Sequence, residues 1–330
     1  MASPVQRSPS SIRVVEPLLM RGVLILAQAA LIALASAPAH SQTQAETRQQ
    51  LLQQVESGQP GRLRDAVSLG EKATAQWPQD AQIRHYLGLA YFKTGDLQRA
   101  KDQLARALDL NPKDSDTHFD LALVLLSQQD NVAAADQLEA ALKLAPSNPL
   151  AHVLLGRAYL NSNRSVQAIG EFKAALRLDP SLRLGHYHLG FAYSSLGRNE
   201  EAIAEYKTEL QRSGENPEVL YELGRSLLES GKHEEAITYL QRASELAPQN
   251  FDVWYNLGKA QVLAERVTPA EASLRKAIAL KPGDPSPHYQ LARALEKSGK
   301  TEEARAERAR FAELKKAQPA TAGMATARDQ

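Results

Sequence analysis

One pattern of small and apolar residues returns every 34 positions from residue 81 to residue 318, without insertion or deletion. A leucine column is made by Leu87, Leu121, Leu155, Leu189, Leu223, Leu257 and Leu291. The next column holds Gly88, Gly156, Gly190, Gly224 and Gly258, with Ala122 and Ala292 in the other two segments. An alanine column follows at Ala100, Ala134, Ala168, Ala202, Ala236, Ala270 and Ala304. A fixed period of this length indicates stacked structural repeats.

Each segment contains two helical patterns separated by a turn. In residues 81–114, apolar residues at three- and four-residue spacing run from Ile83 to Tyr91, and again from Leu97 to Leu108. This spacing predicts amphipathic helices. Gly95 interrupts the first pattern, and Pro112 ends the second because proline lacks a backbone N–H. The sequence therefore predicts a pair of helices in every segment.

The small columns predict close approach of the two helices in each pair. A bulky residue there would overpack the pair, at a cost of roughly 1–3 kcal/mol. Start signals precede several second helices. Asp96 and Asn199 are predicted N-caps, and Thr268 with Glu271 predicts a capping box with Pro269 at the first helical position.

The columns resemble the tetratricopeptide repeat. Residues 86–91 and 254–258, with the alanines and proline that follow each, are similar to that repeat's consensus. Glu209 and Gly214 depart from it, because alanine and proline are usual there. The resemblance implies an all-α fold, a right-handed superhelical solenoid of antiparallel helix pairs.

The two ends of the array differ from its middle. Residues 40–80 are interpreted as a linker and a degenerate N-terminal capping repeat, in which Gln53 and Gln54 replace the usual Leu-Gly pair. Residues 81–318 are seven tandem repeats, the last a capping repeat with Arg308 where an apolar residue is usual. The small and polar residues 319–330 are expected to be disordered.

Residues 1–39 have the pattern of a secretory signal peptide, with Met20 as a possible true start. Arg21 precedes an apolar run that ends at Ala37-Pro38-Ala39, a small-x-small cleavage pattern before His40. The alternative is an uncleaved N-terminal anchor, although the apolar core is short against the roughly 20 residues of a membrane span. The expectation is an exported protein, periplasmic or secreted, with no membrane span after cleavage.

Two columns on the first helices are the candidate binding residues, because the resemblance implies that first helices line a concave groove. One column is His85, Phe119, Val153, Tyr187, Tyr221, Tyr255 and Tyr289. The other is Leu89, Leu123, Arg157, Phe191, Arg225, Lys259 and Arg293. The predicted groove is apolar in its first half and combines tyrosine with basic residues in its second. It suits a peptide with hydrophobic anchors and an acidic end. Alternatively, the tyrosines pack between helices and the cations form a solvated face.

Composition and motifs argue against several other classes. A net charge of +1 provides no basic footprint for nucleic acid. The chain has no cysteine, and no phosphate-binding or nucleophile motif is found. His118, His152, His186 and His288 share a column, but packed helices lie roughly 8–10 Å apart. That separation is too large for neighbouring histidines to share a zinc ion. We expect no enzyme activity, metal or cofactor.

The function that follows is a protein–protein interaction scaffold with protein or peptide partners. It resembles the exported bacterial helper proteins that serve envelope assembly or secretion. Two alternatives remain open at this stage. One is a glycan-binding or polysaccharide-export accessory protein, since tyrosine rings stack on sugars. The other is the non-catalytic part of an enzyme complex. The sequence specifies neither the partner nor the oligomeric state.

Overall fold

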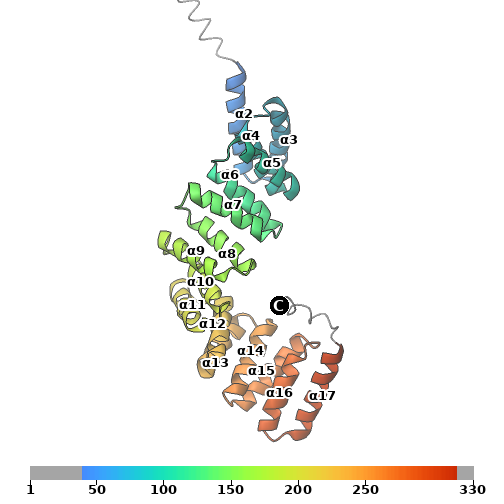
Figure 1. Cartoon of the computed structure of the whole chain (residues 1–330). Coiled ribbons are helices and arrows are strands. Elements are labelled where there is room, and N and C mark those ends of the chain that lie inside the picture. The colour runs from blue at the N-terminus through green and yellow to red at the C-terminus, as the bar shows by residue number, and fades with distance from the viewer. Residues whose placement is uncertain (1–38, 318–330) are drawn as a thin grey trace, which may run out of the picture. The chain divides into compact units, whose positions relative to one another are not determined.

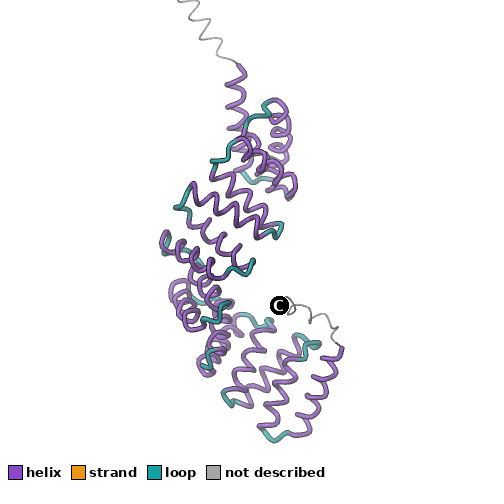
Figure 2. The backbone as a smooth tube through the Cα atoms, in the orientation of Figure 1, coloured by secondary structure: helices purple, strands orange, loops and turns teal. Residues whose placement is uncertain are grey.

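A computed structural model describes residues 39–317, which form helices joined by short turns (Figures 1 and 2). No strand occurs in this range, and the all-α repeat solenoid predicted from the sequence is confirmed. The predicted signal peptide and tail lie outside the described residues, apart from Ala39. Among the helices described, none has the length and apolar character needed to cross a membrane.

The chain divides into two compact units, with the boundary in the sequence between Pro112 and Lys113. In the described part of unit 1, residues 39–112, the helices are α2 (Ala39–Glu56), α3 (Pro60–Gln76), α4 (Ala81–Thr94) and α5 (Leu97–Leu110). Helix α2 therefore includes residues 40–46, the segment interpreted as a linker. Its buried residues Leu51 and Val55 pack in one cluster with Ala66 of α3 and Ile83 of α4.

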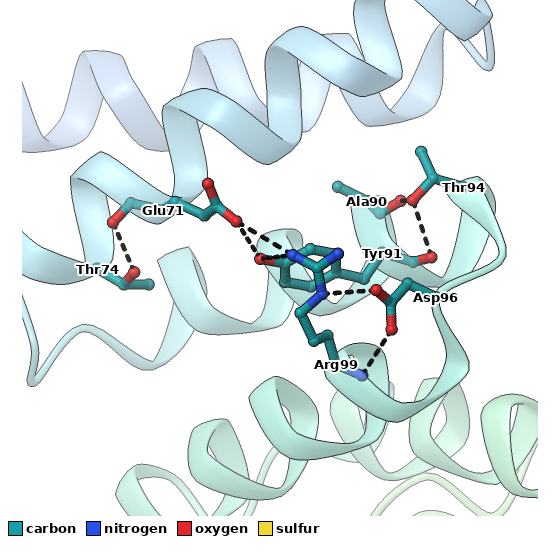
Figure 3. Close-up of polar contacts among 7 residues, drawn as sticks. All are labelled: Glu71, Thr74, Ala90, Tyr91, Thr94, Asp96 and Arg99. Atoms are coloured by element: carbon teal, nitrogen blue, oxygen red, sulfur yellow. Dashed lines mark hydrogen bonds and ion pairs between the residues drawn. The ribbon is translucent and has the colours of Figure 1, made fainter.

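Polar contacts connect successive helices within unit 1. The hydroxyl of Tyr91 donates to Glu71 of α3 at 2.6 Å, and the Arg99 guanidinium lies 4.6 Å from the centre of the tyrosine ring (Figure 3). The Asp96 carboxylate accepts hydrogen bonds from the Arg99 side chain and, at 3.1 Å, from the Arg99 backbone N–H. The second helix thus fixes the tyrosine that joins its own repeat to the preceding helix.

Unit 2, described over residues 113–317, consists of six consecutive helix pairs. They are α6 (Ser115–Ser127), α7 (Asn131–Leu144), α8 (Pro149–Asn161), α9 (Ser165–Leu178), α10 (Gly185–Ser194), α11 (Asn199–Ser213), α12 (Pro217–Glu229), α13 (His233–Leu246), α14 (Phe251–Leu263), α15 (Val267–Leu280), α16 (Ser286–Lys297) and α17 (Thr301–Ala317). Within unit 2, helices that are consecutive in sequence pack on one another. One continuous core cluster runs from Ala122 to Ala260.

The small columns lie where the two helices of a pair approach most closely. All members of the leucine and alanine columns are buried. A Cβ atom added to Gly224 would lie 2.5 Å from Leu240 Cγ, and one on Gly156 would lie 2.6 Å from the Phe172 ring. Both distances are shorter than carbon contacts allow. The packing explanation of the glycine column is therefore confirmed.

Of the predicted caps on second helices, one is confirmed and two are wrong. Asp96 caps α5. Asn199 is the first residue of α11, whose N-cap is Arg198, without a side-chain cap. Thr268 lies inside α15, which begins one residue earlier at Val267, and Glu271 instead pairs with Lys300 at 2.8 Å. Helix α11 begins at the predicted cap residue itself and α15 begins one residue before it, so both cap positions fall on an arginine.

The first helix α10 is capped by a residue distant in sequence. Most first helices of the array are capped by an aspartate or asparagine in the turn, but the corresponding residue in this repeat is Leu182. Glu209 of α11, which is 2% exposed, accepts instead from the backbone N–H groups of Leu184 at 3.1 Å and Tyr187 at 3.4 Å. Glu209, which departs from the repeat consensus, therefore replaces the cap that the turn residue supplies in most of the other repeats.

Candidate protein-binding face

The first helices of unit 2 form the inner side of its stack. From α8 to α16, each first helix contacts the next first helix, whereas no comparable contact joins successive second helices among those described. The stack is therefore shorter along the first helices, which is the inner side of a curved array. We call the surface formed by the two candidate columns on α6, α8, α10, α12, α14 and α16 the first-helix face.

Tyr187, Tyr221 and Tyr255 are half-buried, and the first two connect neighbouring first helices. The Tyr187 hydroxyl donates to Glu218 of α12 at 3.1 Å. The Tyr221 hydroxyl accepts from Asn256 of α14 at 3.4 Å. Burial raises the pKa of Tyr221 to about 12, so its hydroxyl stays protonated at neutral pH. These rings both pack between repeats and contribute to the face, so the packing alternative holds for part of each ring.

An aromatic cluster lies at the middle of the face. The ring centre of Tyr187 is 6.3 Å from that of Phe191 and 6.0 Å from that of Tyr206. Tyr206 is fully buried, while 36% of Phe191 remains exposed. Exposure of a large apolar ring above a packed aromatic base is a feature of protein-binding surfaces. Phe191 is therefore the best-placed apolar anchor on the face.

The four cations of the second column differ in their pairing. Arg225 forms an ion pair with Glu222 at 2.7 Å and donates to Ser194 at 3.4 Å. Burial raises the pKa of the Glu222 carboxyl, and the charge of Arg225 opposes that rise. Arg157 and Lys259 have no carboxylate partner within residues 39–317, and Arg293 donates only to the Gln290 amide. Three positive charges thus remain available on this face.

The apolar start of the predicted groove is divided between the two units. His85 and Leu89 lie on α4 in unit 1 and are not part of the first-helix face. Phe119 and Leu123 of α6 are half-buried against the unit 2 core, and Val153 of α8 is buried. The sequence interpretation missed Leu150, which is 51% exposed one turn before Val153. Its position in the first turn of a first helix was the available signal.

The remaining tyrosines continue the face toward its carboxyl end. The Tyr255 ring stacks on Phe251 at 6.1 Å between ring centres, and burial raises its pKa. Tyr289 is 44% exposed, and its ring centre lies 5.5 Å from that of Phe311 on α17, the last of the described helices. The aromatic surface therefore extends through α16.

The histidine column forms hydrogen bonds within each helix pair. Nδ1 of His152 lies 2.6 Å from Glu171, and Nδ1 of His186 lies 2.6 Å from Glu205. His288 makes the same contact, to Glu307. No group of three or more metal-ligating side chains suited to a metal ion occurs in the described part of the chain. These histidines join the first helix of each pair to the second.

The repeats match known protein-family models. Two sequence models, both described as tetratricopeptide repeat, match the chain. One matches residues 59–115, 87–149, 119–183, 153–217, 187–250 and 221–285, and the other matches residues 273–306. The chain belongs to the tetratricopeptide repeat family. No curated protein matches it in a sequence comparison.

Several solved tetratricopeptide repeat structures share the fold. One is YrrB, described as a tetratricopeptide repeat protein with an unusual peptide-binding site. It is 20% identical to this chain, the alignment covers 55% of this chain and 94% of the YrrB chain, and the TM-score is 0.51. MamA from Desulfovibrio magneticus RS-1 is 20% identical, over 52% of this chain and 97% of its own (TM-score 0.50). The Cut9–Hcn1 structure is 16% identical, over 74% of this chain and 48% of its own (TM-score 0.52). At these identities the likeness shows the fold alone.

Proposed function

We propose that the first-helix face of unit 2 binds an extended or helical segment of a partner protein. The repeat family makes the chain a protein-interaction scaffold, and such proteins are generally non-catalytic. The observation that carries the proposal is the exposed Phe191 ring over its aromatic base, with Arg157 at the equivalent position of the preceding first helix, α8. An apolar anchor beside an unpaired charge provides both affinity and orientation.

Charge on the face indicates the chemistry of the partner. Arg225 is already neutralised by Glu222, so it has little to offer a partner carboxylate. Arg157, Lys259 and Arg293 lack such a neighbour and would pair with acidic residues that flank the apolar anchor. The peptide-binding site named for YrrB, a protein of the same fold, agrees with this type of ligand.

We further propose that the protein is exported and serves envelope assembly or secretion. The support is the sequence of residues 1–39, with Arg21, an apolar run and the small residues before His40. An exported scaffold without catalytic residues would hold other envelope proteins in place.

The test is co-purification from the native host, with partners identified by mass spectrometry. The variant Phe191→Ala/Lys259→Glu should lose the partner while its circular dichroism stays unchanged, and a Tyr187→Ala/Phe191→Ala/Tyr221→Ala variant should do the same. Binding by the wild-type protein should weaken as salt rises, because exposed charges are screened. The matched control is Val166→Ala/Arg275→Glu on the second helices, which should retain the partner.

Retention of the partner by the face variants would contradict the proposed site. Titration with glycans, followed by tyrosine and tryptophan fluorescence, distinguishes the alternative. A saturable response lost in the Tyr187→Ala/Phe191→Ala/Tyr221→Ala variant would favour a glycan-binding role instead.

A further inference from the structure

The fourth residue of each repeat is a ring or a long polar side chain in all repeats except one. The column is Arg84, His118, His152, His186, Leu220, Trp254 and His288. Leu220 is the only aliphatic member. The repeat that contains it, residues 217–250, therefore lacks a side chain that the other repeats supply.

In other repeats, this side chain lies across the junction between the turn that precedes the first helix and the second helix of the pair. We call this junction the seam. His152 contacts Glu171 through Nδ1 at 2.6 Å and the carbonyl of Pro146 through Nε2 at 3.1 Å. Trp254 Nε1 donates to the Pro248 carbonyl at 3.0 Å. Contact with the turn six residues back thus recurs, although the side chain that makes it varies.

In residues 217–250, three positions of this seam change together. Leu220 replaces the ring, Tyr239 occupies the position of Glu171, and Gly214 replaces the turn proline. A cavity of about 370 Å³, open to solvent, lies there between α11, the start of α12 and α13. Leu210, Leu220 and Tyr239 line its apolar part. This volume falls within the range of ligand-binding pockets.

The rim of the cavity is charged but internally neutralised. Arg242 makes a two-pronged contact with Glu215, with both nitrogen–oxygen distances at 2.7 Å. Lys207 donates to Glu235 at 3.2 Å. No hydrogen bond to the Tyr239 hydroxyl is found in the described part of the chain. An uncharged ring with one polar atom therefore fits the site better than a carboxylate or an ammonium group does.

We propose that this cavity receives an aromatic side chain, preferentially tryptophan, from a protein partner. The incoming ring would occupy the space that His152 and Trp254 fill in their own repeats. The site lies between second helices and the turn, so it is separate from the first-helix face.

The test uses N-acetyl-tryptophanamide as the probe and the methyl NMR signals of Leu210 and Leu220 as the readout. Saturable shifts of the Leu210 and Leu220 signals, with a dissociation constant of about 1 mM, are the expected result, since a single side chain binds weakly. Leu220→Trp should fill the cavity, weaken binding by about tenfold or more, and raise the melting temperature. Leu220→His provides a second filled variant if the tryptophan variant fails to fold.

A reciprocal variant strengthens the test. Pro146→Gly/His152→Leu/Glu171→Tyr reproduces the Gly214, Leu220 and Tyr239 arrangement in the repeat of residues 149–182, and should create a second site for the probe. The proposal is overturned if the wild-type methyl signals do not shift, or if a folded Leu220→Trp or Leu220→His variant binds the probe as well as the wild type does.

Discussion

The surroundings of His188 alter its ionisation strongly. Its ring stacks on Phe172 with 5.5 Å between ring centres, and meets the edge of Tyr187 at 5.4 Å. Burial, followed by the nearby charge of Arg157, lowers the pKa of His188 to about 4, while Glu209 opposes the shift. The imidazole is therefore neutral at physiological pH, and its protonation would place a charge beside the aromatic cluster.

This shift predicts a defined dependence of stability on pH. In the unfolded chain the histidine pKa is about 6.5, so the unfolded state binds a proton that the folded state does not between about pH 6.5 and 4. The contribution of His188 is present above pH 6.5, is lost as pH falls through this window, and levels off below about pH 4. The full loss is up to about 3 kcal/mol.

Urea unfolding of the wild type and His188→Gln at pH 7, 5 and 4 measures this contribution. The variant should show a shallower fall in the free energy of unfolding, since other titrating groups are common to both proteins. Parallel curves for the two proteins would show that His188 has the same pKa in both states.

At the scale of elements, α10 depends on the second helix of its own repeat for its N-terminal cap. It is ten residues long, and its N-cap residue, Leu184, has a left-handed backbone with φ of 59°. The Glu209 carboxylate accepts hydrogen bonds from backbone amides at the start of the helix. A negative charge at a helix N-terminus is also favourable. Ser213 donates to the same carboxylate at 2.6 Å and holds it in place.

Glu209→Ala should reduce the free energy of unfolding by roughly 1.5–3 kcal/mol, the usual cost of losing hydrogen bonds to a charged group. Glu209→Gln should cost less, because one acceptor oxygen remains. Amide hydrogen exchange at Leu184 and Tyr187 should accelerate in the alanine variant. Glu200→Ala, an exposed change on the same helix, is the control and should cost less than about 1 kcal/mol. Equal losses for Glu209→Ala and Glu200→Ala would exclude the capping role.

At the scale of the whole molecule, the repeats of unit 2 contact mainly their neighbours in sequence. Stability should therefore depend on the number of repeats and on the contacts between them. The turns allow one repeat to be removed with little damage. Asn216 caps α12 and Asn250 caps α14 in the same way, so deletion of residues 217–250 joins Asn216 to Phe251 and preserves the cap.

The 34-residue deletion should give a shorter folded solenoid, with an unchanged helical signal per residue and a lower urea midpoint. The matched control deletes residues 217–232 alone, which leaves α13 without its first helix and exposes Leu240. That protein should unfold at much lower urea or aggregate. Circular dichroism with urea titration compares them, and a repeat deletion that behaves like the half-repeat deletion would contradict nearest-neighbour packing.

Much of this arrangement could be predicted from the sequence, because the periodic contacts are short in sequence and recur in phase. Gly224 against Leu240, like the glycine and the large side chain at the equivalent positions of four other repeats, links positions 16 residues apart within one helix pair. A column pattern reports such contacts directly. The helix pairs from residue 81, the close approach at the glycines and the tetratricopeptide repeat family were therefore all accessible from the amino-acid order.

The candidate site was only partly accessible. The two columns identified the tyrosines and cations, but not that Arg225 is neutralised, although Glu222 three residues earlier was a usable signal. Leu150 was missed because it belongs to neither column. Whether a cation is available depends on the groups around it, which a column of like positions does not report.

The sequence by itself determined the repeat, its period and the face that each residue takes on its helix. The tertiary structure decided which departures from the period matter. Glu209 caps α10 from a position 25 residues after Leu184 in sequence, and the Leu220 cavity needs changes in the turn after α11, on α12 and on α13 together. The physical reason is that periodicity encodes contacts repeated in every helix pair, whereas burial, charge pairing and empty space at one position depend on several elements at once.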